Sequence, residues 1–178
     1  SLALVMETRI GELEGLYATL SHELKAARIP AADVYLSEYF DSTRDQNGAF
    51  CDPLIRVDAQ TLRPYSVAIP NPFLRKLAFA ATSTVLDFDR AEAEWAYRNV
   101  LGPLNAQVRA AATKHGWRLV NGVAERFAEH GYCSNDPWIV GLFESFERQH
   151  DANGTLHATT YGNRQTATLA LRRLLPEL

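Results

Sequence analysis

The chain has 178 residues, of which 47% are hydrophobic, and it carries a formal net charge of −3 with a pI of about 5.9. That length and apolar content suffice for a domain with a buried core. The basic residues are scattered, which argues against nucleic acid as a partner. No apolar run reaches the roughly 18 residues of a membrane span, and the N-terminal stretch gains charge too early for a signal peptide.

The N-terminal third predicts a helix followed by a strand. The helix has one apolar face and ends before Ile29-Pro30. Its apolar residues, at steps of 3, 1, 3 and 4, are Leu13, Leu16, Tyr17, Leu20 and Leu24. Residues 32–40 (ADVYLSEYF) then predict a strand, because turn-forming residues bound them on both sides.

The middle of the chain predicts a loop and then a helix. The stretch Asp52–Pro72 contains four prolines and is predicted to be a flap over a substrate site or a cover for a sheet edge. A helical pattern starts at Asp89, and Gly102-Pro103 should kink or restart it. Its apolar positions are Tyr97, Leu101, Leu104, Val108 and Ala111.

A second strand at residues 116–122 (GWRLVNG) and a closing helix at residues 168–175 (TLALRRLL) complete the pattern. Helices alternating with strands are typical of an α/β protein with parallel strands. Parallel sheets are buried on both faces, and two strands cannot cover three or more helices. We therefore expect further strands of the sheet to lie outside this chain.

The two cysteines, Cys51 and Cys133, both lie in loop-like surroundings. They predict a disulfide, worth about 4 kcal/mol in the chain-entropy model, and an oxidising compartment. The alternative is two free thiols in a cytosolic protein. Two ligands 82 positions apart without companion ligands do not specify a zinc site.

Three stretches in order resemble the C-terminal portion of SGNH hydrolases, the GDSL-type esterase and lipase family: residues 33–52, 100–140 and 144–163. They contain a strand with an acidic, glycine-bearing turn leading to Cys51, a helix with a Pro-Leu-Asn step leading to a strand, and a Gly-x-x-His loop before the last helix. The resemblance covers roughly residues 10–175.

The resemblance implies a three-layer α/β/α sandwich with a parallel, flavodoxin-like sheet, of which residues 1–178 form the C-terminal part of a single domain. It implies a serine ester hydrolase in which His157 is the general base, with Gly162 matching the glycine five residues on. Histidine titrates near neutral pH, which suits this task. The implied substrate is an acyl lipid or an acylated carbohydrate, the implied location is secreted or extracytoplasmic, and no cofactor or metal is implied.

The chain departs from the family around the histidine. His157-Ala158 replaces the usual His-Pro, and Gly154 stands where a common member has Asp. Asp136 and Asp151 are not at the motif spacing. We therefore expect the backbone carbonyl of Thr155, or of a close neighbour, to orient the imidazole in a Ser-His dyad, since fixing the tautomer is the essential task of a third group.

None of the eight serines follows a strand in a Gly-Asp-Ser motif, so this chain has no recognisable nucleophile. We expect the nucleophile from a companion N-terminal segment or a second chain. The alternative is a non-catalytic binding or interaction domain built on the same scaffold.

Overall fold

The computed structural model describes residues 1–57 and 86–175. The chain divides into two compact units. Unit 1 lies within residues 1–41, 95–127 and 164–178, and unit 2 within residues 42–94 and 128–163.

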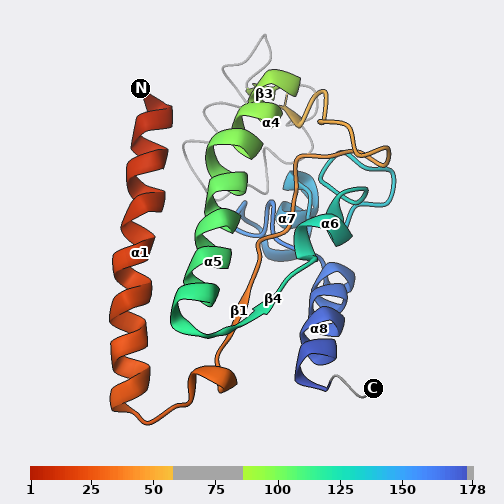
Figure 1. Cartoon of the computed structure of the whole chain (residues 1–178). Helices are drawn as coiled ribbons and strands as arrows, with labels where there is room; N and C mark the ends of the chain where they lie inside the picture. The colour runs from red at the N-terminus through yellow and green to blue at the C-terminus, as the bar shows by residue number, and fades with distance from the viewer. Residues whose placement is uncertain (58–85, 176–178) are drawn as a thin grey trace. The chain divides into compact units, whose positions relative to one another are not determined.

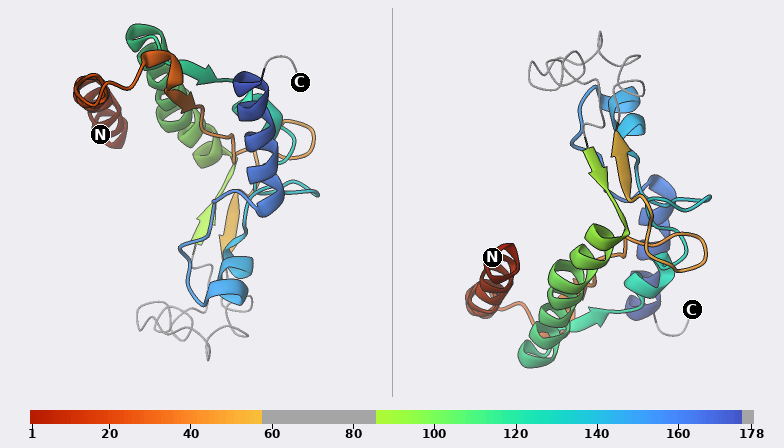
Figure 2. Two further views of the ribbon diagram at one scale, coloured as in Figure 1. Left: turned by 90° about the horizontal axis from the view of Figure 1, so that it is seen from below. Right: turned by 90° about the horizontal axis from the view of Figure 1, so that it is seen from above.

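Two long helices dominate unit 1, α1 (Leu2–Ala26) and α5 (Gly102–His115), which lie side by side in Figures 1 and 2. The side chain of Ser1 caps α1 by accepting the Leu4 amide, and Gly116, at φ 69°, ends α5 in the left-handed conformation that favours glycine. Tyr17 of α1 packs edge-on against Trp117, with ring centroids 6.1 Å apart. The predicted helix end before Ile29-Pro30 is confirmed.

The predicted single apolar face of α1 is wrong in part. Leu13, Tyr17 and Leu24 are half-buried, but Leu16 and Leu20 are 64% and 44% exposed. The buried residues of α1 are Ile10 and Ser21. The α5 contact is therefore centred further round the helix than the leucine spacing indicated.

The predicted helix restart at Gly102-Pro103 is confirmed. Helix α4 (Arg90–Ala96) leads into a π-helical turn, η3 (Tyr97–Leu101), and α5 begins at Gly102 with Pro103 in its first turn. Proline has no amide hydrogen to continue the helical ladder. The wider turn before it absorbs the break, with the Gly102 amide bonded to the carbonyl of Tyr97.

Both predicted strands are present in unit 1 but are three residues long. A 3₁₀ turn, η1 (Ala31–Asp33), leads into β1 (Tyr35–Ser37), which pairs in parallel with β4 (Arg118–Val120). The short helix α6 (Val123–Phe127) follows, and α8 (Thr160–Leu174) ends the described chain. The buried core contains Val108, Ala111, Ala112, Trp117, Val120, Val123 and Phe127.

In unit 2, β2 (Ile55–Val57) pairs antiparallel with β3 (Leu86–Phe88). Helix α7 (Leu142–Gln149) follows, and Leu142 packs with Tyr132 against the buried Ile55. β2 begins within the stretch predicted to be a loop, Asp52–Pro72, and that stretch lies outside the described residues from position 58 onward.

The predicted three-layer α/β/α sandwich with a flavodoxin-like parallel sheet is wrong. The structure is mostly helical, with 57% helix against 9% strand, and its parallel sheet has only the strands β1 and β4 among the described residues. Two strands of three residues offer too little surface to seat helices on both faces. Helix α1 packs mainly on α5 and η3 instead of on a sheet.

Candidate functional site

We define the His157 loop as residues 151–159, which connect α7 to α8 within unit 2. His150, at φ 62°, ends α7, and its amide bonds to the carbonyl of Phe146 at 3.0 Å. The Asp151 carboxylate then accepts the Asn153 amide at 2.8 Å and the Asn153 side-chain amide at 3.0 Å. This turn starts the loop without help from a distant residue.

The hydroxyl of Ser145, on α7, fastens the loop to its preceding helix. This hydroxyl donates to the Asp151 carbonyl at 2.7 Å, and its oxygen accepts from the Gly154 amide at 3.0 Å and from Gln149 Nε2 at 2.9 Å. Ser145 is only 1% exposed, so these bonds form away from water.

The same cluster explains the glycine at position 154. A Cβ there would collide with the Gln149 amide and would lie 3.0 Å from Ser145 Oγ. An aspartate, which the family resemblance leads one to expect at this position, does not fit unless Gln149 moves. An aspartate at this position would therefore have to displace the Gln149 side chain.

A short antiparallel bridge between Ile139 and Ala158 fastens the other end of the loop. The Val140 amide donates to the His157 carbonyl at 2.8 Å, and the Leu156 amide donates to the Val140 carbonyl at 3.0 Å. Leu156 has φ 65°, a conformation that costs about 1 kcal/mol or more for a non-glycine residue and persists only where neighbours enforce it. The backbone is thus held immediately before and at His157.

The imidazole of His157 is exposed, and it makes no hydrogen bond or ion pair with any residue that the structure describes. Its backbone amide bonds to the Gly154 carbonyl at 3.1 Å, and the Thr155 amide bonds to the Ala152 carbonyl at 3.0 Å. The predicted bond between the ring and the Thr155 carbonyl is not formed in this arrangement. The Thr155 hydroxyl is buried and has no partner among the described residues.

Neither acid named from the sequence bonds the His157 ring. The Asp151 carboxylate is occupied by Asn153, and Asp136 lies beside His130, with the Asp136 Oδ2 3.4 Å from the His130 Nδ1. The His130 ring stacks on Trp138 with centroids 3.7 Å apart, so its contacts are those of a packing residue. Trp138 also meets Tyr161 edge-on at 5.1 Å.

The predicted disulfide between Cys51 and Cys133 is confirmed, with a Cα–Cα distance of 5.7 Å and no free cysteine in the chain. Gly131 lets the two segments approach, since a Cβ there would collide with the Arg44 backbone. The Tyr132 amide also donates to the Ser42 carbonyl at 2.9 Å. The bridge lies in the same unit as the His157 loop.

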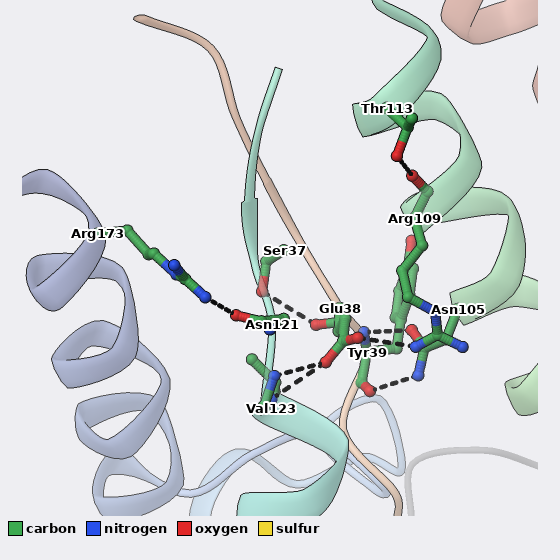
Figure 3. Close-up of polar contacts among 10 residues, drawn as sticks. Ser37, Glu38, Tyr39, Asn105, Arg109, Thr113, Asn121, Val123 and Arg173 are labelled. Carbon is green, nitrogen blue, oxygen red and sulfur yellow. Dashed lines mark hydrogen bonds and ion pairs between the residues drawn. The ribbon is translucent and has the colours of Figure 1, made fainter. Parts of the chain in front are cut away.

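Unit 1 contains a polar cluster that the sequence did not reveal, centred on Glu38 directly after β1 (Figure 3). One carboxylate oxygen accepts from Arg109 at 2.7 Å, and the other accepts the Gly122 and Val123 amides at 2.8 and 3.3 Å. The Asn105 side chain forms two hydrogen bonds with the backbone of Tyr39, which follows Glu38. It accepts from the Tyr39 amide at 2.7 Å and donates to the Tyr39 carbonyl at 2.9 Å. The Glu38 side chain is 2% exposed.

This cluster joins elements that are far apart in sequence, namely the end of β1, α5 and the start of α6. The carboxylate satisfies amides at the start of α6 that have no helical partner, which is a capping role. A glutamate that follows a strand gives no signal of this in the sequence. Ser145 gives none either, because two of its three partners, Asp151 and Gly154, lie outside its own helix.

No family model, no curated protein and no solved structure matches this chain. Across residues 1–57 and 86–175, no group of three or more metal-ligating side chains is assembled. No helix in that part of the chain has the length and apolar character needed to cross a membrane.

Proposed function

We propose that this chain is the C-terminal portion of a serine ester hydrolase and that His157 is the general base. The observation that carries the proposal is an exposed imidazole on a loop whose backbone is fastened at both ends, by Ser145 and by the bridge from Ile139 to Ala158. A base must reach a reacting proton in a fixed geometry while its ring stays accessible.

In the proposed reaction, Nε2 of His157 takes the proton of the serine hydroxyl as that oxygen attacks the acyl carbonyl carbon. The same proton passes to the leaving alcohol oxygen, and the acyl group stays on the serine. Water then attacks the acyl-serine, with His157 again taking and returning one proton. The nucleophile comes from a companion segment or a second chain, because none of the eight serines of this chain stands in a Gly-Asp-Ser motif. Ser145, near the loop in sequence, uses its hydroxyl to hold the loop.

The Thr155 carbonyl remains the proposed acceptor for the other ring nitrogen. It accepts no hydrogen bond from the residues that the structure describes, whereas the Ala152 and Gly154 carbonyls already hold the amides of Thr155 and His157. A rotation of the exposed ring on binding the serine would form this dyad. Catalytic hydrogen bonds often tighten only in the complete complex.

The proposed substrate is an ester of an acyl lipid or an acylated carbohydrate. Tyr161, 52% exposed and in contact with Trp138, offers an apolar surface in the first turn of the helix that follows the loop. The Cys51–Cys133 bridge supports a secreted or extracytoplasmic location, since such bonds persist in oxidising compartments.

The second candidate is a non-catalytic binding or interaction domain. The observation that favours it is that no described serine hydroxyl bonds the His157 ring, in a chain whose fold is mostly helical. The two candidates differ in whether the complete protein contains a serine that His157 activates.

The deciding experiment uses the complete native protein and any chain that purifies with it. A fluorophosphonate probe should label one serine outside residues 1–178, and p-nitrophenyl esters of increasing acyl length should be hydrolysed. His157→Ala should lower kcat by about 10³-fold or more. The matched control is His150→Asn, an exposed histidine at φ 62° where asparagine is tolerated, and it should keep activity within about twofold.

Two outcomes overturn the proposal. One is a complete protein that neither reacts with the probe nor hydrolyses any ester, which leaves the binding domain. The other is an active protein in which His157→Ala and His150→Asn behave alike, which would assign the base to another residue.

A further inference from the structure

One flank of α1 bears an apolar stripe, centred roughly 120° round the helix from the buried Ile10 and Ser21. Four large apolar side chains on it are strongly exposed: Leu2 at 60%, Val5 at 51%, Leu16 at 64% and Leu20 at 44%. At about 100° of rotation per residue, all four fall within one arc of roughly 60°. Exposed apolar patches on a protein surface often mark sites of interaction with another protein.

The stripe follows the spacing of a coiled-coil seam. Leu2, Val5 and Leu16 fall at a and d positions of a heptad, and Leu20 adjoins the next d position. The two intervening seam positions, at the middle of the stripe, are Arg9 and Glu12. We call these six residues the outer stripe.

From either end, the outer stripe begins with two apolar residues and then reaches a charged one. Apolar pairs occupy its ends, Leu2 with Val5 and Leu16 with Leu20, and the opposite charges lie on either side of its centre. In an antiparallel pair of α1 helices, Val5 would therefore meet Leu16 of the other copy. At the centre, each Arg9 would meet the other copy's Glu12.

A parallel pair would give the opposite result. In that register Arg9 would face a second Arg9, and Glu12 a second Glu12, and like charges in contact are unfavourable. The charges therefore select the antiparallel arrangement, which is a two-fold interface that uses the same surface on both copies.

Among the described residues, the only ion pair that Arg9 and Glu12 form is with each other. Arg9 and Glu12 form an ion pair on their own helix at 3.0 Å, but both side chains are exposed, at 71% and 53%. Exposed pairs of this kind contribute little to stability. Exchanging the pair between two copies costs almost nothing, and the contact removes the four apolar side chains from water.

We propose that two copies of this chain associate through the outer stripe of α1, antiparallel, about a two-fold axis that passes between Arg9 and Glu12. The inference concerns the assembly of unit 1 alone and does not depend on the proposed hydrolase activity. It predicts a reversible dimer whose formation is independent of His157.

The first test measures sedimentation of the 178-residue chain over about two decades of concentration around the micromolar range. Wild type should pass from monomer to dimer. Leu16→Glu should weaken the dimer by about tenfold or more, because a charge then replaces the apolar side chain that meets Val5 of the other copy. The control is Leu4→Glu, which alters a 60% exposed leucine of the same helix that lies about 100° away from Val5.

The second test fixes the orientation with introduced cysteines, which would be the only free thiols in the chain. A mixture of Val5→Cys and Leu16→Cys chains should cross-link to each other under mild oxidation. Val5→Cys alone should not cross-link to itself, since two Val5 residues would be separated by about 16 Å along the axis in an antiparallel pair.

The third test uses the charges. Arg9→Glu alone and Glu12→Arg alone should each weaken self-association by about tenfold. An equal mixture of the two variants should recover wild-type affinity as a heterodimer, because every contact between positions 9 and 12 of the two copies then joins a glutamate to an arginine. The pair within one chain stays broken in this mixture, so recovery reports the contact between copies.

The proposal is overturned by a wild-type chain that stays monomeric over the whole range, or by a dimer that Leu16→Glu and Leu4→Glu weaken equally. Efficient self-cross-linking of Val5→Cys would indicate a parallel pair and would also overturn it. A failure of these tests would leave the proposed hydrolase function untouched.

Discussion

The two units fasten irregular backbone in different ways. In unit 1, a buried carboxylate, Glu38, ties the end of β1 to α5 and to the start of α6. In unit 2, a neutral hydroxyl, Ser145, and the Cys51–Cys133 bridge hold the loops.

The difference has a physical consequence. A buried charge forms strong bonds but leaves a large penalty when one partner is removed. A neutral hydroxyl contributes less and costs less when lost, and a disulfide acts by restricting the unfolded chain. The stability of unit 1 should therefore depend most on the Glu38 side chain, whereas the stability of unit 2 should depend most on the Cys51–Cys133 disulfide.

The largest effect is expected from the disulfide. Cys51→Ser/Cys133→Ser should lower the free energy of unfolding by about 4 kcal/mol in the chain-entropy model, because the bridge spans 82 positions. Denaturant unfolding of the variant should match that of wild type with a reductant. A loss below about 1 kcal/mol would show that the surrounding contacts, such as Gly131 against Arg44, already hold the loops.

Glu38→Ala should cost about 3 kcal/mol, because it leaves Arg109 without its partner and the Gly122 and Val123 amides without an acceptor. The control is Glu125→Gln, an exposed glutamate on α6, which should cost less than about 0.5 kcal/mol. Thermal unfolding of both variants gives the comparison. Equal effects would mean that the buried carboxylate is no more important than a surface one.

Ser145→Ala should cost about 1 to 2 kcal/mol and should raise amide hydrogen exchange in residues 151–157, since the Asp151 carbonyl and the Gly154 amide lose their partner. Thr168→Ala removes an exposed hydroxyl bonded to the Arg164 carbonyl and is the matched control, with little expected change. If exchange in the loop stays at the wild-type rate, the bridge between Ile139 and Ala158 alone fixes it.

A smaller effect is expected at alkaline pH. Burial raises the pKa of the Tyr132 phenol above its ordinary value of 10.0, against an opposing effect of the Leu142 amide, which donates to its oxygen at 2.9 Å. A raised pKa in the folded state means that folding favours the protonated phenol. This stability is fully present below the unfolded pKa, near 10, and is lost as the pH rises through the folded value.

Tyr132→Phe should therefore cost about 1 kcal/mol at neutral pH, because the Leu142 amide loses its acceptor, and the deficit should shrink as wild type is titrated from about pH 9 to pH 11. Urea midpoints of both proteins across that range give the measurement. A difference between the two proteins that does not change with pH would show that Tyr132 does not titrate with folding.

The sequence determined the features that depend on neighbouring residues. The end of α1 before Pro30, the restart of α5 at Gly102-Pro103 and the places of β1 and β4 follow from backbone restrictions and local hydrophobic spacing. The pairing of Cys51 with Cys133 followed because the chain offers no other cysteine.

Only the tertiary structure decided which predicted faces are covered and by what. The helix–strand alternation gave the wrong fold class because it does not state how long the strands are or whether helices cover a sheet or each other. The partners of Glu38 and Ser145, and the exposure of Leu16 on α1, depend on contacts between residues far apart in the chain. Local propensity acts over a few residues, but burial and hydrogen-bond partners are set by segments that meet only after folding, so no local pattern encodes them.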